Sequence, residues 1–571
     1  MRARDLLIPA IVIAALAPAS GALADGGPIM PLSQVRPGMQ CTGETVMQGT
    51  TISTFDVSVL GVVTQAGEGA RILVSVSGPA VDATGVAQGF SGSPVYCPGP
   101  GAATENAGAI SEGLGDYGNK LALVTPIEQM LGEPVVPPAG ARRLALRTRA
   151  LVGPLTVSGL SPALLSVVER AGARAGRPVL ASPASTGATF PVQPLVPGAS
   201  VGVSYSTGVI GIGAVGTVTY RDGAIVYAFG HPLDEAGRRS LLLQDAYVYD
   251  VIPSPEPQVP SYKLAAPGHV EGTLTSDTPN AVIGEVGAAP RLIPVDISAR
   301  DLDTGQLLEE DSQVADETDV GLPLGNSLLD VVAPLAVGQA ATDVYDGAPA
   351  NESGTMCVRI DLRESRLPLR VCNRYVGSGA TGGSASEPTE LAGGTASDVT
   401  SALALLDAEQ FAQLHVTKVT ASIEARRGLA EARILAARAP TRVRAGQQVK
   451  VELLVQRFRG ALERISFELR IPRNARGQLS VRIHGPSAPE SGSSVSSGSL
   501  VSSLTIALGG GSPPSSTPTP TSMRELRSEF AAIATYDGVQ ASFTGQGSRD
   551  VYRNPSLLIT GQAQLRFSVG G

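Results

Sequence analysis

The chain contains no tryptophan and few other aromatic residues, and it has only four cysteines, four histidines and four lysines in 571 residues. The shortage of aromatic rings disfavours a carbohydrate-binding or adhesive β protein. The net charge of −8 at pH 7 predicts no nucleic-acid partner, because such partners select basic surfaces. After the N-terminus, no unbroken apolar run approaches the roughly 18 residues of a membrane-spanning helix, so we expect no membrane span.

Glycine and proline are abundant instead, with 67 and 43 residues. Together with short alternating apolar runs, they predict many turns and strands and therefore a mainly β fold. At roughly 150 residues per domain, a chain of this length should hold several domains.

The N-terminal segment has the pattern of a secretory signal peptide. Arg2 and Arg4 precede an apolar run that starts at Leu6, and small residues around Ala24 supply a cleavage site. We predict a signal peptide at residues 1–24 and export to a periplasmic or extracellular compartment.

Export predicts that the four cysteines form disulfides. Cys357 and Cys372 lie on two strand-like runs that face each other in a predicted hairpin, which leaves Cys41 and Cys97 as the other pair. Four cysteines nevertheless permit three pairings. A four-cysteine zinc site would need closer spacing, so we expect no metal.

A Gly-Phe-Ser-Gly-Ser-Pro motif at residues 89–94 is the strongest candidate for chemistry. Two glycines around Ser91 allow a tight turn, so that the hydroxyl projects and nearby amides converge. This pattern suits a nucleophilic Ser91 with an oxyanion hole formed by the amides of Gly89 and Ser91. The alternative is an ordinary β-turn.

His231 is the best candidate for a general base. It follows a strand-like run directly and stands between Gly230 and Pro232, where it would be rigid and partly exposed. The other histidines, His269, His415 and His484, lie in a turn, a predicted strand and a linker border, and we interpret them as structural or solvated.

Residues 211–216 match the spelling of the dinucleotide-binding fingerprint. Residues 217–220 continue as a strand, however, whereas the fingerprint requires a helix there. We therefore predict no nucleotide and no other cofactor.

Three separated motifs together resemble the SpoIVB-type serine peptidase domain. They are the serine motif, a predicted helix start at residues 125–131 with Thr125 as its N-cap, and the Phe-Gly-His-Pro sequence at residues 229–232. Residues 216–220 and 261–264 also fit, and the similarity spans residues 30–297. The resemblance implies a chymotrypsin-like β-barrel site in which Ser91 is the nucleophile and His231 the base.

The chain departs from the family pattern in three respects. Phe90 stands where the family has methionine, the serine precedes the histidine, and no aspartate occupies the family's orienting position. Asp82, Asp234 and Asp245 are the available candidates for that third residue, and the sequence does not choose among them. A PDZ module is not evident.

The domain boundaries follow changes in composition. We expect a peptidase domain at residues 25–300, a β-rich connecting region with a Gly/Ser linker at 301–397 and an immunoglobulin-like β-sandwich at 398–483. A Ser/Pro/Gly-rich linker at 484–522 and a segment at 523–571 with a helix and then strands complete the chain.

Two functions are compatible with these patterns. The first is an exported serine endopeptidase that cleaves a protein or peptide substrate through Ser91 and His231. The second is a catalytically inactive, peptidase-like envelope scaffold or binding protein.

Overall fold

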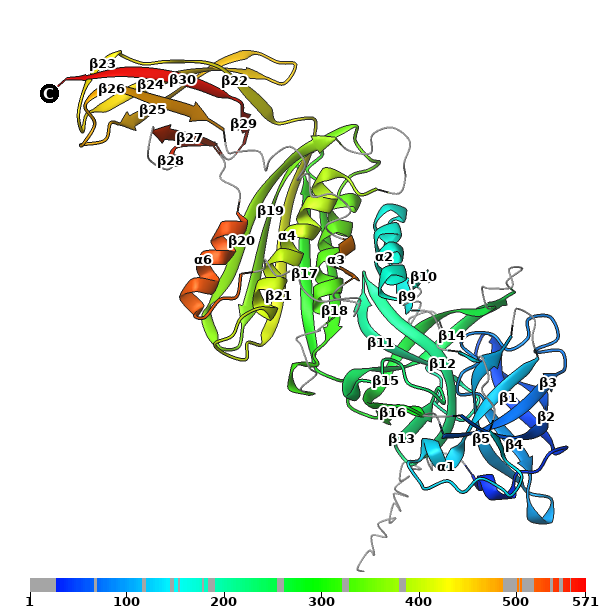
Figure 1. Ribbon diagram of the computed structural model, residues 1–571. Coiled ribbons are helices and arrows are strands. Elements are labelled where there is room, and N and C mark those ends of the chain that lie inside the picture. The colour runs from blue at the N-terminus through cyan, green and yellow to red at the C-terminus, as the bar shows by residue number, and fades with distance from the viewer. Residues whose placement is uncertain are drawn as a thin grey trace, which may run out of the picture.

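The computed structural model describes most of the chain, and the predicted signal peptide and most of the predicted second linker lie outside the described residues. It is mainly β, with four sheets spread between the first strands at one end and the last strands at the other (Figure 1). In the part that is described, no helix combines the length and apolarity needed to cross a bilayer. The described residues are 27–65, 69–115, 120–143, 148–151, 155–176, 179–182, 190–253, 261–320, 328–378, 387–485, 501–502, 504–505, 518–534, 538–543, 548–554 and 556–570.

The first six strands form a closed barrel, here called the first barrel. The strand order is β1-β4-β5-β6-β3-β2, and β2 pairs back with β1. Alternation of apolar and polar residues directs an aliphatic core inward, together with Phe55 and Phe90. The strands are β1 (Gln40–Gln48), β2 (Thr51–Gln65), β3 (Gly69–Ser77), β4 (Pro94–Pro98), β5 (Thr104–Leu114) and β6 (Leu121–Pro126), with β7 (Arg142–Arg143) and β8 (Thr148–Ala150) added at β2 and β5.

Strand pairing in the next sheet closes a second ring of six, here called the second barrel. Its order is β12-β13-β16-β15-β14-β11, and β11 pairs with β12. The glycine-rich residues 211–216 lie inside β12, so the strand that the sequence predicted in place of a nucleotide-binding helix is confirmed. The strands are β11 (Ser200–Gly208), β12 (Gly211–Asp222), β13 (Ile225–Ala228), β14 (Gly237–Ile252), β15 (Tyr262–Thr278) and β16 (Ala281–Val286), with β9 (Leu155–Ser158) and β10 (Val179–Ala181) alongside β12.

The same sheet continues past the second barrel, so the predicted boundary at residue 300 is wrong. That residue lies inside β17 (Leu292–Asp301), which pairs with both β18 (Leu307–Ala315) and β21 (Val416–Arg427). The sheet ends with β19 (Asn351–Leu362) and β20 (Ser365–Ser378). Helices α2 (Pro162–Ala175), α3 (Leu329–Asp343), α4 (Glu390–Asp407) and α6 (Met523–Ile533) pack on this part of the molecule (Figure 1).

Helix α4 corrects the prediction of a linker that extends to residue 397. The helix begins at Glu390, and the Thr389 hydroxyl accepts a hydrogen bond from the Ala392 amide. Its small residues allow close packing rather than flexibility: a Cβ on Gly394 would lie 2.5 Å from the Tyr375 ring. The remaining part of that predicted linker, residues 379–386, is outside the described residues.

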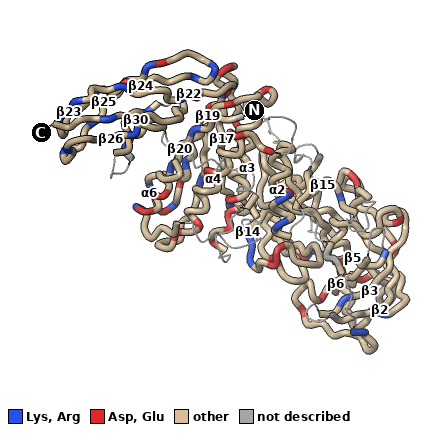
Figure 2. The backbone as a smooth tube through the Cα atoms, turned by 45° about the horizontal axis from the view of Figure 1, so that its top comes forward, with Lys and Arg blue, Asp and Glu red and all other residues tan. Residues whose placement is uncertain are grey.

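The last two sheets form a β-sandwich that begins at Glu431 rather than at residue 398. Its four-stranded and five-stranded sheets enclose one apolar core. Lys and Arg outnumber Asp and Glu in the sequence of its strands, and their positions are coloured along the backbone in Figure 2. The helix and strands predicted after residue 523 are present, and these C-terminal strands complete both sheets. The strands are β22 (Glu431–Arg438), β23 (Arg442–Arg444), β24 (Gln448–Arg457), β25 (Leu462–Arg470), β26 (Gly477–His484), β27 (Gly538–Phe543), β28 (Ser548–Arg553), β29 (Leu558–Thr560) and β30 (Gln562–Gly570).

Both predicted disulfides are present. Cys41 and Cys97 join β1 to β4 inside the first barrel, and Cys357 and Cys372 face each other across the β19–β20 hairpin. All four cysteines are therefore paired.

Removal of the Cys41–Cys97 disulfide should cost more stability than removal of the Cys357–Cys372 disulfide. The first closes a loop of 56 residues and the second a loop of 15. In the loop-entropy model, double alanine variants should lower the free energy of unfolding by about 4 and about 3 kcal/mol. Denaturant titration of the two variants beside wild type measures the difference, and the reverse order would contradict this account.

Candidate active site at the contact of the two barrels

The serine motif forms a tight loop immediately before β4. Gly89 and Gly92 both have positive φ, 89° and 92°, which other residues rarely adopt. Between them, the Phe90 ring is buried in the core of the first barrel, with its centroid 6.3 Å from that of Phe55. We call residues 88–93 the serine loop.

The Ser91 hydroxyl is buried, with 0% of the residue exposed, and it makes no hydrogen bond to any described residue. In the described chain, the Gly89 and Ser91 amides also lack an acceptor, whereas the neighbouring amides of Gln88, Phe90 and Gly92 each donate to a backbone carbonyl. The two amides that the sequence predicted as an oxyanion hole are thus the two in this stretch without a partner.

Thr217 on β12 connects the serine loop to the second barrel. Its amide donates to the Ser91 carbonyl at 2.8 Å, and its carbonyl accepts from the Phe229 amide at 3.4 Å. Gly92 fits into this junction because it has no side chain. A Cβ there would overlap the Thr217 carbonyl oxygen and lie 2.6 Å from the Phe229 nitrogen.

His231 follows β13 through a sharp corner. Phe229 and Gly230 both have a φ of 70°, and such a value is strained for a phenylalanine. The Thr125 hydroxyl donates to the Gly230 carbonyl at 2.7 Å and fixes this corner. The predicted N-cap role of Thr125 is therefore wrong. The residue lies within β6, which ends at Pro126, and Pro126 occupies the N-cap position of α1 (Ile127–Met130), which has no side-chain cap.

The His231 ring is buried and is not hydrogen bonded to Ser91. Its Nδ1 lies 2.7 Å from the Pro232 carbonyl oxygen, which assigns the proton to Nδ1 in the neutral ring. Its Nε2 is buried and makes no hydrogen bond of good geometry to the described residues, although the Leu151 carbonyl lies close enough to the ring to raise its pKa, as the Pro232 carbonyl does. Burial lowers the pKa of His231 to about 4, and the nearby Arg71 charge also lowers it.

None of the three candidate aspartates contacts His231. Asp82 forms an exposed ion pair with Lys120, and Asp234 pairs with the buried Arg239. Asp245 accepts hydrogen bonds from the amide and Nδ1 of His269. The groups that face the His231 ring are therefore backbone carbonyls, that of Pro232 at 2.7 Å and that of Leu151.

Lys263, which the sequence analysis did not propose as a functional residue, lies directly against the serine loop. Its amide donates to the Gln88 carbonyl at 2.9 Å, and its side chain passes 3.1 Å from the position of a Cβ on Gly89. The residue is 5% exposed, and within the described residues it has no ion pair. Burial lowers the pKa of Lys263 to about 7.

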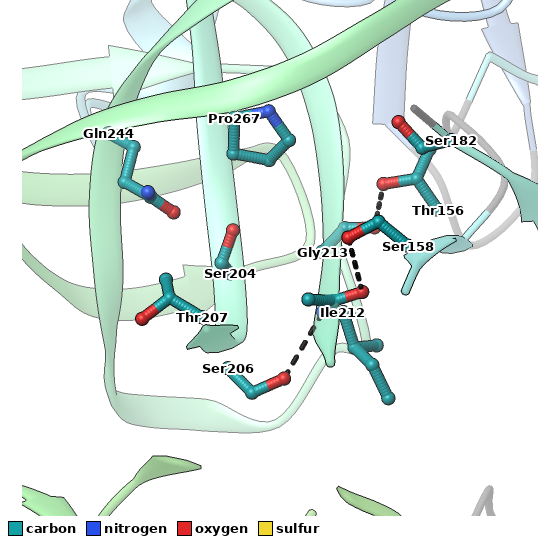
Figure 3. A pocket seen from close by; sticks show the side chains of 11 residues that line it. Thr156, Ser158, Ser182, Ser204, Ser206, Thr207, Ile212, Gly213, Gln244 and Pro267 are labelled. Atoms are coloured by element: carbon teal, nitrogen blue, oxygen red, sulfur yellow. Dashed lines mark hydrogen bonds between the residues drawn. The ribbon is translucent and has the colours of Figure 1, made fainter. Parts of the chain in front are cut away.

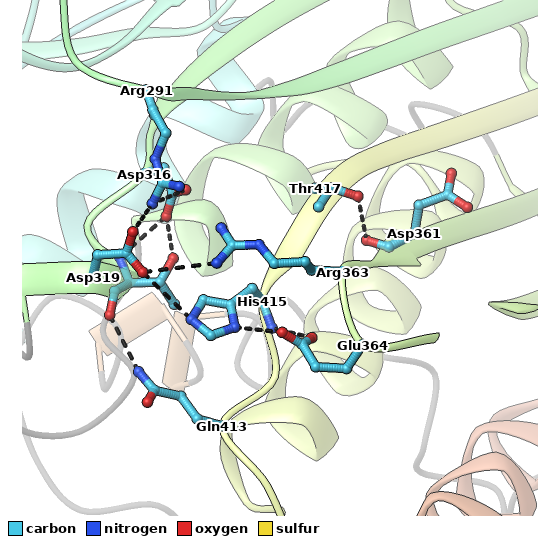
Figure 4. A network of polar contacts seen from close by, with 10 residues as sticks. Arg291, Asp316, Asp319, Asp361, Arg363, Glu364, Gln413, His415 and Thr417 are labelled. Atoms are coloured by element: carbon cyan, nitrogen blue, oxygen red, sulfur yellow. Dashed lines mark hydrogen bonds and ion pairs between the residues drawn. The ribbon is translucent and has the colours of Figure 1, made fainter. Parts of the chain in front are cut away.

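The other two histidines are held by polar partners far from the serine loop in sequence. His415 contacts Glu364 and Asp319 in a network that also includes Arg291, Asp316 and Arg363 (Figure 4). His484 contacts the Gly485 carbonyl and the Ser542 hydroxyl. These contacts agree with a structural interpretation.

A small cavity between β9, β11, β12 and β14 is separate from the serine loop. Hydroxyl side chains of Ser158, Ser204 and Ser206 line it, with the Gln244 side chain on another side (Figure 3). Its lining includes no residue of the serine loop and no residue of the His231 corner. Hydroxyl groups without a base or an acid beside them give this cavity no evident catalytic chemistry.

No protein-family model, curated protein or solved structure matches this chain. The resemblance to SpoIVB-type peptidases therefore stays a prediction that depends on the motifs that carry it. Function has to be argued from the geometry of the serine loop and its neighbours.

Gly92→Ala should lower the free energy of unfolding much more than the same substitution at a glycine where an added Cβ would contact no other atom. We expect a loss of about 3 kcal/mol, because a left-handed φ and overlap with backbone atoms both act there. Gly132→Ala is the matched control, since Gly132 has a φ of 77° and nothing within 4 Å of an added Cβ. It should cost about 1 kcal/mol. Denaturant unfolding measures both, and equal losses would contradict the close approach.

His231 should make the fold sensitive to acid. The unfolded chain takes up a proton near pH 6.5, whereas the folded ring resists it until about pH 4, so stability is present above this window and is lost within it. The loss should be roughly 3 kcal/mol relative to His231→Asn, which retains a donor for the Pro232 carbonyl. Urea titrations between pH 7 and pH 4 test this, and parallel curves for the two proteins would contradict it.

Proposed function

We propose that this chain is an exported serine endopeptidase in which Ser91 is the nucleophile. The observation that carries the proposal is the unbonded Ser91 hydroxyl in a loop whose free amides are those of Gly89 and Ser91. Most buried polar groups in proteins have partners, so three unpartnered groups in three residues favour a role that a substrate would complete. A carbonyl of the substrate would accept from the two amides as its oxygen becomes negative.

The arrangement of the barrels supports the finer fold assignment within this proposal. Two closed six-stranded barrels meet at the serine loop, and in a chymotrypsin-like architecture the reacting groups come from such a contact. The sandwich at the other end of the chain would be an immunoglobulin-like module that binds substrate or a surface. Two disulfides are consistent with export.

In this proposal the substrate is a protein or peptide, and the first step is acyl transfer. Ser91 Oγ forms a bond to the scissile carbonyl carbon while a base takes the hydroxyl proton. The base returns that proton to the leaving amine as the C–N bond breaks, and water then releases the acyl group. The family resemblance assigns the base role to His231, with the Pro232 carbonyl in place of an aspartate.

A second function, a non-catalytic scaffold of the envelope, is favoured by a different observation. Ser91 is completely buried, and no hydrogen bond joins it to His231. A degenerate site would keep the fold without a route for substrate. The two functions differ in whether Ser91 reacts.

Labelling with a fluorophosphonate probe distinguishes them, because the probe modifies a serine only when a base and an oxyanion hole activate it. We expect the mature protein to be labelled and Ser91→Ala to lose the label completely. Ser93→Ala is the matched control, since Ser93 is also buried with an unbonded hydroxyl two residues away. It should keep the label.

Circular dichroism of each variant verifies folding. A folded wild type without label, or equal labelling of Ser91→Ala, would reject the peptidase and favour the scaffold.

A further inference from the structure

Lys263 is a buried cation side chain without an anion. Lysine is rarely buried unless it is paired, because removing an ammonium from water is costly. Lys263 is nevertheless 5% exposed, and within the described residues no carboxylate forms an ion pair with it. Such a position favours the neutral amine, which has a lone pair that can accept a proton.

Hydroxyl groups of two threonines hold the amine beside the serine loop. Lys263 Nζ lies 2.8 Å from Thr45 Oγ1 and 3.3 Å from Thr217 Oγ1. Thr217 is the residue whose amide bonds the Ser91 carbonyl, and its hydroxyl donates to the Gly89 carbonyl at 3.2 Å. Thr217 therefore connects the Lys263 amine to the serine loop at two places, the Gly89 carbonyl and the Ser91 carbonyl.

Three separate elements build this arrangement. Thr45 comes from β1 of the first barrel, whereas Thr217 and Lys263 come from β12 and β15 of the second barrel. Backbone bonds between Gln88 and residues 261 and 263 fix the start of β15 along the serine loop. The Phe90 ring lies under the amine, with Nζ 5.2 Å from its centroid, and this contact favours the protonated form once it has been created.

We propose that Lys263 is the general base for Ser91, with Thr45 and Thr217 as the groups that orient its amine. This inference rests on the proposed peptidase function and replaces His231 in the base role. Ser91 Oγ and Lys263 Nζ are not hydrogen bonded in this structure, so one of the two side chains must turn when substrate arrives. Catalytic hydrogen bonds often form only in the complex.

The proton transfers balance without a carboxylate. The neutral amine takes the Ser91 proton as Oγ attacks the carbonyl carbon, and the electron pair of the C=O bond moves to the oxygen. The resulting ammonium then protonates the leaving amine as the C–N bond breaks, which restores the neutral base. In the second half, the amine takes a proton from water while the water oxygen bonds to the acyl carbon, and it returns that proton to Ser91 Oγ as the acyl–Oγ bond breaks and the carboxylic acid leaves.

The two candidate bases predict different pH dependences. Labelling of Ser91 requires an unprotonated base, so the labelling rate should rise as the pH passes the pKa of that base. For Lys263 that pKa is about 7, and for His231 it is about 4. A labelling rate that rises through neutrality therefore indicates the lysine.

The decisive experiment measures fluorophosphonate labelling rates from pH 4 to pH 9 for wild type, Lys263→Met, Lys263→Arg and His231→Asn. We expect both Lys263 variants to lose about 10²–10⁴-fold in rate, because neither thioether nor guanidinium accepts a proton. In His231→Asn the labelling that remains should still rise through neutral pH, because the lysine still supplies the base. Lys120→Met, at an exposed lysine, is the control and should label normally.

Thermal unfolding separates loss of chemistry from loss of fold. Lys263→Met removes a buried cation without a counter-charge, so at pH 6 its Tm should equal or exceed that of wild type. The difference in Tm between Lys263→Met and wild type should become smaller as the pH rises from 7 toward 10. In that range the wild-type amine is neutral in the folded state and is increasingly neutral in the unfolded state too.

The outcomes also distinguish this inference from the proposed function. If Lys263→Met labels at the wild-type rate while His231→Asn does not, or if the wild-type rate rises near pH 4, the lysine proposal is overturned and the peptidase stands. If folded wild type is not labelled at any pH, the peptidase and the lysine base are rejected together.

Discussion

The site depends on the backbone amide and the backbone carbonyl of Thr217. Its two hydrogen bonds attach the serine loop of the first barrel and the His231 corner of the second barrel to a single point on β12. Backbone atoms make this junction, so the main requirement is that two neighbouring residues have no side chain. Gly92 and Gly216 leave room for Thr217 and for the Phe229 ring. The relative position of the barrels, and hence of every group near Ser91, follows from that close approach.

Neither of the two bases considered for Ser91 forms an ion pair with an acid among the described residues. His231 is held by a carbonyl and Lys263 by two hydroxyls, and neither has a carboxylate among the described residues. Burial therefore favours the neutral form of both bases. Of the two, only the lysine changes protonation near neutral pH. The proposed hydrolytic site would therefore not need a carboxylate, because its base need not be stabilised as a cation before substrate binds.

Local features could be predicted from the sequence, and features made by distant pairing could not. The turn at Gly89 and Gly92, the strand through residues 211–216 and the Cys357–Cys372 hairpin all follow from short-range patterns. The continuation of the sheet through residue 300 depends on pairing with β21, more than a hundred residues later, and composition cannot reveal it. Glycines in α4 resembled a linker because small residues serve both flexibility and close packing. Lys263 gave no signal, since a lone lysine in a strand is ordinary until the fold buries it.

The path of the chain through the sandwich has a consequence for how the protein is made. After β26 the chain leaves the sandwich, and α6 packs against β20 and α4 of the large sheet before β27–β30 return. The late strand β30 then lies between β23 and β26, which are otherwise not neighbours in the sheet. During synthesis, the early sandwich strands must therefore remain with their apolar faces uncovered until residues as late as 570 have been made. This period is when the chain most needs protection from aggregation.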